Sequence, residues 1–308
     1  MAYKIHTFLL QEPVRVIYFL MEALGLTQPA AARLVDKGRV RLNGEVLTVK
    51  TPVTGRLEVL AFDAQGSGLT PQFIAPDFAV FEKPAGMLVH PNGFDSGATV
   101  LDDARNCFGN AAQLIHRIDR ETSGLVMVSR HRKAEGELKE LFAAHLVQKT
   151  YLLYARGRVE GERLIDAPIV QGTKERNARL GLPKVMGAIS REQGKSARTM
   201  IRAVRYLPEF DATLVAALPV TGRTHQIRLH MAHIGHPILG DCLYGAPLEI
   251  ADAWLSGTIL RADRIAASGA DRILLHADRV RFFYGCRYEL ASQSGFGRSA
   301  VLEEARSC

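Results

Sequence analysis

A highly charged loop leads directly into an apolar run, and this junction constrains the chain more than any other feature. Residues 116–124 include five titratable side chains, and the apolar residues 125–128 follow at once. Such a run predicts a buried strand. Charges at the mouth of a buried strand are costly to desolvate unless they are paired, so they indicate a salt-bridge network or a catalytic site. Asp119 lies between Arg117 and Arg120, which favours an ionised carboxylate suited to a nucleophile or a base.

For an isolated loop, a solvated polar turn would be the simpler interpretation. Features elsewhere in the chain are needed to choose between such a turn and a functional site. The 308 residues are 47% hydrophobic and 23% charged, which is an ordinary composition for a globular protein with a sizeable core. We expect one small and one large domain. No stretch approaches the roughly 18 apolar residues of a membrane span. The four cysteines form no C-x-x-C pair, so neither zinc nor a disulfide framework is indicated. A soluble, cytoplasmic protein fits best.

The charge distribution favours a polyanionic partner. The formal net charge is +7, which favours nucleic acid, although basic proteins with small substrates are common. Residues 172–205 contain nine Lys or Arg and two Glu, so this segment alone carries an excess of seven positive charges. We expect it to form a face that lies against phosphate groups. Over residues 156–194 we predict loops with short strands.

The N-terminal region has the pattern of a small α+β unit. Gly25 ends a first helical pattern, and Asn43-Gly44 is a strong signal for a hairpin turn. The expected helices and strands lie over residues 13–24, 30–37, 39–42, 46–49 and 56–62. Gly and Pro residues then mark a linker over residues 66–72, which separates a first domain of residues 1–65 from the second.

The run RLVDKGRVRLNGEV at the centre of this unit resembles the S4-type RNA-binding domain, over about residues 12–62. The resemblance implies RNA binding, and basic groups on the second helix and the next strand could follow a phosphate backbone. The alternative is a helical hairpin with ordinary surface charge. The residues that we expect to contact RNA are Arg33, Lys37, Arg39 and Arg41.

The second domain, predicted over residues 73–290, alternates short strands and helices. We predict strands over residues 78–82, 125–129, 149–154, 197–207, 211–218, 273–276 and 279–283, and helices over residues 99–107, 133–146 and 226–232. From Ala291 onward the sequence is polar, and we expect a mobile C-terminal tail over residues 291–308.

Five motifs of the second domain resemble those of the RluA-type RNA pseudouridine synthases. They are EKPAGMLVHP, HRIDRETSG, QKTY, TGRTHQIRLHMAHIGHPILGDCLYG and LLHA, and they stand in the order of that family over residues 73–283. The resemblance implies an α+β fold, in which a small S4-like domain precedes a catalytic domain with a mixed, mostly antiparallel sheet flanked by helices and loops. It also implies an enzyme that converts specific uridines of structured RNA, ribosomal or transfer RNA, to pseudouridine.

On this resemblance Asp119 is the catalytic aspartate and Arg228 is the arginine that pairs with it. Tyr151 is the tyrosine that stacks on the uracil or moves a proton. The reaction breaks the N1–C1′ bond, rotates the base and joins C5 to C1′. Asp119 could add to the base, attack C1′ or abstract a sugar proton, and the sequence leaves these three roles open. Without the motifs, Arg228 would be read as a surface arginine and Tyr151 as a packing residue.

A base inside a stacked helix is out of reach, so the target nucleotide must be turned out. The resemblance implies that Arg117 fills the vacated space or grips the adjacent phosphate. Leu275 is expected to pack beside the base, with a plain core leucine as the alternative. Lys149, Arg223 and His225 lie in the same motifs, and we expect them to contact the substrate.

The sequence also bears on a metal site and on two other functions. The histidines between residues 225 and 236 have no carboxylate at zincin spacing, so we expect no metal, and the reaction implies no cofactor. A binding protein on this fold that has lost catalysis would act in RNA folding. A hydrolase of glycosidic bonds would need a carboxylate pair, and Glu121 is too close to Asp119 in sequence to face it across a sugar. We expect a monomer.

Overall fold

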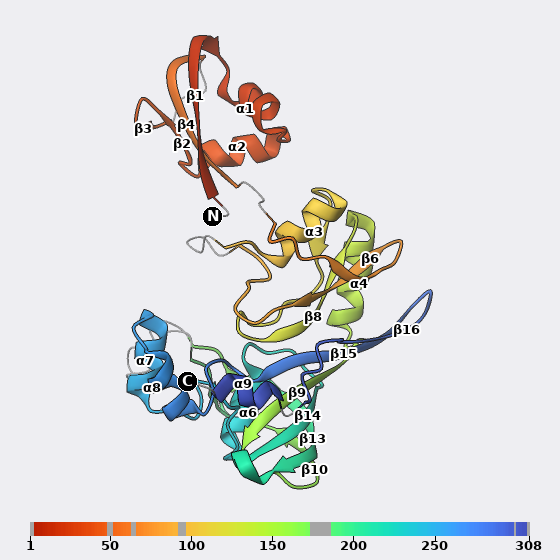
Figure 1. Ribbon diagram of the computed structural model, residues 1–308. Coiled ribbons are helices and arrows are strands. Elements are labelled where there is room, and N and C mark those ends of the chain that lie inside the picture. Colours follow the sequence, from red (N-terminus) through yellow and green to blue (C-terminus); the bar gives the residue numbers. More distant parts are fainter. Residues whose placement is uncertain are drawn as a thin grey trace.

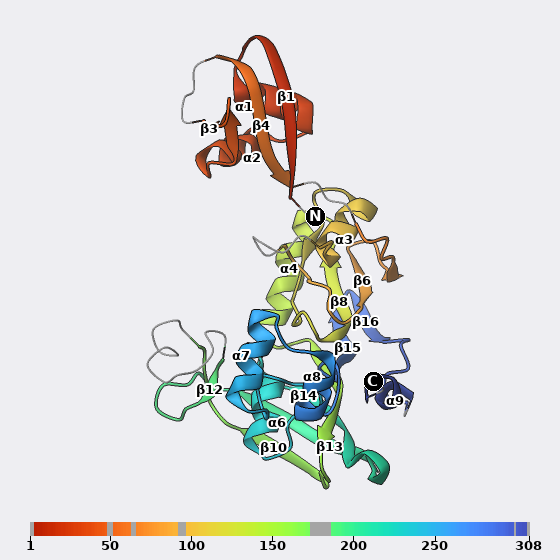
Figure 2. The same cartoon turned by 60° about the vertical axis from the view of Figure 1, so that its left-hand side comes forward.

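The computed structural model describes residues 3–47, 52–62, 66–91, 97–172, 186–298 and 300–306. Two β-sheets dominate it, a four-stranded sheet near the N-terminus and a ten-stranded sheet that contains most of the later strands. Figures 1 and 2 show the smaller sheet, in red and orange, at one end of the molecule, with the larger sheet and its helices making up the rest.

Two helices pack on the four-stranded sheet. In chain order its elements are β1 Tyr3–Val14, α1 Val16–Leu24, α2 Gln28–Asp36, β2 Val40–Leu42, β3 Glu45–Val46 and β4 Val53–Phe62. The strands pair in the antiparallel order β1-β4-β2-β3. Leu20, Val40, Leu57 and Val59 are fully buried between sheet and helices. The two helices, the hairpin and β4 confirm the sequence prediction, while residues 48 and 49 of the predicted second hairpin strand lie outside the described residues.

Positive φ angles explain where this unit turns. Gly25 has a φ of 61° at the end of α1, and Asn43 and Gly44 have φ angles of 50° and 89° in the hairpin turn. These values suit glycine and asparagine, which enter the left-handed region at low cost. Strand β1 was not predicted. Apolar side chains lie on both of its faces, since Ile5 and Leu9 are exposed whereas Leu10 is buried and Phe8 is half-buried, and this hides the alternation that marks a strand.

The ten-stranded sheet has the order β10-β13-β14-β9-β15-β8-β6-β5, with β16 added to β15 and β7 to β8. Only β15 and β8 pair in parallel among these described strands, which confirms the predicted mixed, mostly antiparallel sheet. Its strands are β5 Pro71–Ile74, β6 Phe78–Lys83, β7 Gln113–Leu114, β8 Ser123–Ser129, β9 Gln148–Arg156, β10 Glu162–Asp166, β13 Arg198–Leu207, β14 Ala212–Pro219, β15 Leu275–Tyr284 and β16 Cys286–Ala291. A separate two-stranded sheet pairs β11 Ile169–Val170 with β12 Ala188–Ile189.

Helices flank the larger sheet on its two faces (Figure 1). They are α3 Val100–Phe108, α4 Arg132–Ala143, α6 Gln226–His233, α7 Leu248–Ser256, α8 Arg261–Ser268 and α9 Ala300–Arg306. The first three confirm predicted helices. Helices α7 and α8 were not predicted, and neither has a side chain that caps its N-terminus, so a sequence signal for their start is missing. In the part of the chain that the structure describes, no helix has the length and apolar content needed to cross a membrane.

Two predictions for the C-terminal region are wrong. The segments at residues 273–276 and 279–283 were expected to be two strands, but one strand, β15 Leu275–Tyr284, includes the end of the first segment and all of the second. It has a bulge between Ala277 and Arg279, and its hairpin partner is β16. A bulge breaks the alternation of side chains, so one strand resembles two. The expected mobile tail instead ends in α9, where Leu302 and Ala305 are buried against the sheet.

Candidate active site

The charged loop that precedes β8 meets α6 from a distant part of the sequence. Asp119 lies in this loop, and its side chain is 31% exposed. Its Oδ2 accepts a hydrogen bond from Arg228 Nη1 at 3.3 Å. Helix α6 carries Arg228, and it packs on β13 and β14 of the larger sheet through Ile227 and Met231. The sheet therefore brings together the two residues that the motifs had predicted to pair.

A second carboxylate fixes Arg228, whose side chain is only 3% exposed. Asp241 accepts hydrogen bonds from Arg228 Nε at 2.7 Å and from Arg228 Nη2 at 2.9 Å, the two-pronged geometry in which arginine binds carboxylates best. Burial opposes the positive charge, yet the pKa of Arg228 is raised, because Asp241 and, more weakly, Asp119 stabilise the cation. The guanidinium also lies over the ring of Tyr244, 5.1 Å from its centre.

Asp241 is a residue that the sequence analysis missed. Besides binding Arg228, its Oδ1 accepts the backbone N–H groups of Leu243 and Tyr244, so this fully buried carboxylate is completely satisfied. It stands in the same long motif as Arg228, within the segment GDCLYG. A buried arginine needs a buried counter-ion, and this requirement was the signal that could have identified it.

Tyr151 approaches the site from β9, where it pairs with Ala217 of β14 and with Ala277 of β15. The side chain is half-buried and packs on two of the hydrophobic clusters of the sheet. Burial and the nearby charge of Asp119 both raise its pKa, so the phenol keeps its proton at neutral pH. A protonated phenol can stack on a base and can donate a proton.

His225 closes the site on the side of α6. Its Nε2 lies 3.9 Å from Asp119 Oδ2, and its Nδ1 lies 2.8 Å from the hydroxyl of Tyr244. Its backbone has a φ of 56°, which is uncommon for a residue other than glycine. Burial and the charge of Arg228 lower its pKa, so the imidazole is neutral.

Lys83, at the end of β6, binds the loop that carries Asp119. It is completely buried, and its ammonium group donates to the carbonyl oxygens of Pro84, Met87 and Arg120 at 2.8 to 2.9 Å. Arg120, which had no role in the sequence analysis, donates from Nε to the carbonyl of Gly86. The KPAG motif and the aspartate loop therefore form one hydrogen-bonded unit.

Glu121 points away from the site into a separate ion pair. Both of its oxygens accept hydrogen bonds from Arg264 of α8, and the indole N–H of Trp254 in α7 donates to Oε1. Backbone N–H of Ile273 adds a further bond. This carboxylate connects the two unpredicted helices to the aspartate loop. Both of its oxygens are used in these contacts.

The other predicted substrate contacts lie around this centre at different depths. Arg117 is exposed on the loop, whereas Leu275 is buried in the cluster on which Tyr151 packs. Lys149 is half-buried, with its Nζ above the ring of Phe142. Arg223 is half-buried and donates from Nε to the carbonyl of Ser196 at the edge of β13.

The predicted RNA contacts outside the centre are mostly exposed. Arg33, Lys37 and Arg41 of the N-terminal unit are exposed, and Arg39 is half-buried. In the basic segment, residues 173–185 lie outside the described residues. Its remaining basic side chains are all exposed, namely Arg191, Lys195, Arg198, Arg202 and Arg205.

Two other histidines of this segment, one in α6 and one just after it, form hydrogen bonds within the protein. His230 is buried between the hydroxyl of Thr199 and the carbonyl of Ala167, and His236 bonds the carbonyl of Arg156. Among the described residues no group of three His, Cys, Asp or Glu side chains could hold a metal ion.

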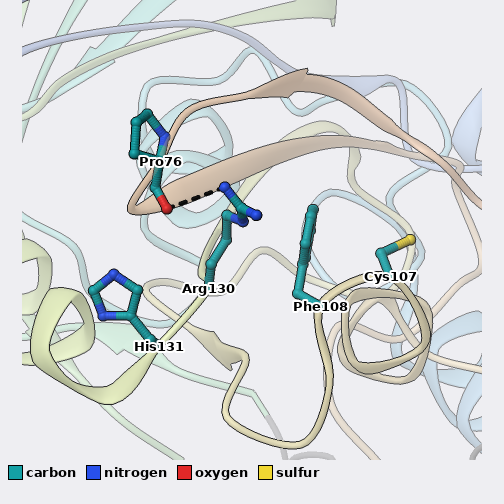
Figure 3. A pocket seen from close by; sticks show the side chains of 5 residues that line it. All are labelled: Pro76, Cys107, Phe108, Arg130 and His131. Atoms are coloured by element: carbon teal, nitrogen blue, oxygen red, sulfur yellow. Dashed lines mark hydrogen bonds between the residues drawn. The ribbon is translucent and has the colours of Figure 1, made fainter.

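A cavity of about 340 Å³ lies elsewhere, between the turn that precedes β6 and the ends of α3 and β8. Figure 3 shows Arg130 reaching across it to the carbonyl of Pro76, with Phe108 alongside. None of the predicted catalytic residues lines it, so it is not part of the candidate site.

Fold, site and sequence together place the protein among the RNA-modifying isomerases. The family described as RNA pseudouridylate synthase matches residues 77–233, a range that contains Asp119, Tyr151 and Arg228. The chain belongs to the RNA pseudouridine synthase family.

Similar proteins agree over most of the chain. An uncharacterized RNA pseudouridine synthase of Helicobacter pylori is 33% identical over 92% of this chain and 94% of its own length. The ribosomal large subunit pseudouridine synthase D of Yersinia pestis is 30% identical over 85% of this chain and 84% of its own. The tRNA pseudouridine synthase C of Vibrio cholerae is 34% identical over 66% of this chain and 80% of its own length. The solved human RNA pseudouridylate synthase domain containing 1 shares the fold, with a TM-score of 0.58 and 24% identity over 78% of this chain and 88% of that one.

Proposed function

We propose that this protein converts specific uridines of structured RNA to pseudouridine, with ribosomal RNA as the first substrate to test and transfer RNA as the second. The observation that supports this most is the contact of Asp119 with the buried Arg228. A carboxylate that is accessible yet held by a buried cation is suited to react in its ionised form. Relatives named for ribosomal and for transfer RNA motivate the two substrates.

In the proposed reaction the uracil leaves C1′, turns, and returns through C5. Asp119 acts on the base, on C1′ or on a sugar proton, and each of these roles needs the ionised carboxylate. Arg228 holds its rotamer, and Tyr151 stacks on the detached uracil with its phenol protonated. The isomerisation changes no oxidation state, so we propose that no cofactor takes part.

RNA binding is proposed to use both units of the chain. Arg117 would enter the space of the flipped nucleotide, while Lys149, Arg223 and Leu275 would contact the target and its neighbours. The S4-like domain of residues 1–65 would track phosphates through its basic residues, and the catalytic domain of residues 73–290 would present the segment 172–205. We propose that the enzyme acts as a monomer in the cytoplasm.

The test is a map of pseudouridine in cellular RNA. RNA from a strain of the source organism that lacks this gene is incubated with the purified wild-type protein or with an Asp119→Asn variant, and carbodiimide primer extension then locates pseudouridine. The wild type should restore at least one site, and the variant should lose about 10³-fold in rate, within the range for a positioned acid or base. If the wild type restores no site but binds the RNA, the alternative of an inactive RNA-binding protein is supported. Equal activity of the variant would remove only the role of Asp119.

A further inference from the structure

The hydroxyl of Tyr244 has two hydrogen-bond partners, and these indicate where the hydroxyl proton points. The backbone N–H of Gly187 donates to it at 3.0 Å, and His225 Nδ1 lies 2.8 Å away. A backbone N–H can only donate, so the hydroxyl oxygen accepts from Gly187 and its own proton is available to Nδ1. In the described part of the chain no other acceptor lies within hydrogen-bond distance of that hydroxyl.

The tautomer of His225 follows from this bond. A neutral imidazole has one nitrogen that donates and one that accepts. When the Tyr244 hydroxyl donates its proton to Nδ1, that nitrogen is the acceptor and the ring proton is on Nε2. The charged groups around the ring are consistent with a neutral imidazole: burial, Arg228 and Arg117 lower the pKa of His225, against Asp119 and Asp241, which raise it.

With this tautomer, the N–H of Nε2 is on the side of the ring that faces Asp119. It lies 3.9 Å from Asp119 Oδ2, which is too far for a hydrogen bond, and no other acceptor among the described residues takes it. The backbone of His225 is in the left-handed region, with a φ of 56°, a strained conformation of the kind that is found at functional sites. A donor thus lies next to the carboxylate without a hydrogen-bond partner among the residues that the structure describes.

We propose that Tyr244 is a positioning residue, whose hydroxyl holds His225 as the Nε2–H tautomer so that His225 donates a hydrogen bond to an oxygen of the target nucleotide beside Asp119. This inference rests on the proposed function for its substrate, but the tautomer itself is a property of the free protein. The ring contact of Tyr244 with Arg228 does not involve the hydroxyl, so the role can be tested by removing that one atom.

The first test is ¹⁵N NMR of the histidine side chains in the free protein, with a His225→Asn variant to assign the signal. The wild type should show His225 as a neutral ring protonated on Nε2, and Tyr244→Phe should show both tautomers. Tyr284→Phe is the matched control, because it removes a hydroxyl that donates to Glu137 on a different element. A ring that is protonated on Nδ1 in the wild type, or a tautomer that is unchanged in Tyr244→Phe, overturns the inference whether or not the protein modifies RNA.

The second test is a double-mutant cycle on kcat/KM with the RNA site found for the wild type. Asparagine tolerates the left-handed backbone at position 225 but lacks a donor at the place of Nε2. Tyr244→Phe and His225→Asn should each lower kcat/KM by up to about tenfold, as expected for one hydrogen bond. The double variant should be no slower than His225→Asn alone, whereas losses that multiply would overturn the coupling.

Discussion

Arg228 binds Asp119 through one nitrogen while its other two nitrogens are occupied by Asp241. The contact to Asp119 spans 109 residues of sequence, and that to Asp241 spans 13. Asp241 therefore fixes the plane of the guanidinium, and the guanidinium in turn fixes the orientation of the accessible carboxylate. The arrangement separates two tasks, since one acid satisfies the buried cation and the other remains available to a substrate.

Replacement of Arg228 by lysine tests this division. A single ammonium group cannot bind Asp241 through two prongs and reach Asp119 as well. We expect Arg228→Lys to lower kcat by about 10²-fold, which is the cost of a small misplacement of a reacting group. Single-turnover conversion of the target RNA measures it.

The matched control is Arg261→Lys, which changes the arginine of a surface ion pair with Asp271. That variant should keep its turnover, because exposed pairs contribute little. Wild-type turnover in Arg228→Lys would show that Asp119 is positioned by something other than this guanidinium.

The sequence revealed the parts of this centre that carry local signals. The run of residues 125–128 gave β8, and the motifs named Asp119, Tyr151 and Arg228, which approach one another only in three dimensions. Asp241 and Lys83 were missed, although both stand in quoted motifs. Their importance comes from burial and from partners far away in sequence, and neither can be read from the spacing of residues.

The same limit explains the errors in the fold. Helix α9 was expected to be a mobile tail, because its few apolar residues carry weight only once Leu302 meets the sheet. Strand β1 was missed because both of its faces carry apolar side chains. In each case tertiary packing, rather than local propensity, decides the structure.

Glu121 should matter for stability and not for chemistry. Its carboxylate is bound by Arg264, Trp254 and a backbone N–H, so Glu121→Gln loses a hydrogen-bonded charge in a mostly buried place. We expect the free energy of unfolding to fall by about 2 kcal/mol while kcat stays close to that of the wild type.

Urea unfolding measures the effect on stability, and single-turnover rates measure the effect on chemistry. Asp119→Asn is the comparison, because the opposite pattern is expected for it. That variant should lose turnover and retain stability. A stable Glu121→Gln protein without turnover would indicate a chemical role for Glu121. It would also support the alternative that the protein is a hydrolase of glycosidic bonds with a carboxylate pair.

Lys83 predicts a dependence of stability on pH. Burial lowers its pKa to about 7, against a weaker opposing effect of Asp119, whereas in an unfolded chain a lysine has a pKa of about 10.4. Between these two pKa values the unfolded chain binds a proton that the folded chain does not. The contribution of Lys83 to the free energy of unfolding therefore rises with pH. Below about pH 7 both states are protonated and the contribution is constant.

The measurement is the difference in stability between the wild type and Lys83→Met, by urea unfolding at several pH values between about 7 and 10. Taking the difference cancels the other groups that titrate in this range. It should grow in favour of the wild type as the pH rises. A constant difference would mean that the three carbonyl acceptors keep the ammonium charged in the folded state.

The exposed arginines of β13 should set the salt dependence of RNA binding. Arg198 and Arg202 are exposed on this strand within the basic segment. Each phosphate contact that is lost lowers the slope of log K against log salt concentration by about 0.7 for single strands and about 0.9 for a duplex. Filter binding of Arg198→Ala/Arg202→Ala over a range of salt concentrations should therefore show a shallower slope and weaker binding at low salt.

Lys139→Ala is the control, since this lysine of α4 pairs with Glu135 and lies outside the basic segment. It should leave the slope unchanged, because its charge is already partnered within the protein. If the double variant has the wild-type slope, its two arginines do not contact phosphates. The excess charge of residues 172–205 would then have to act through other members of the segment or not at all.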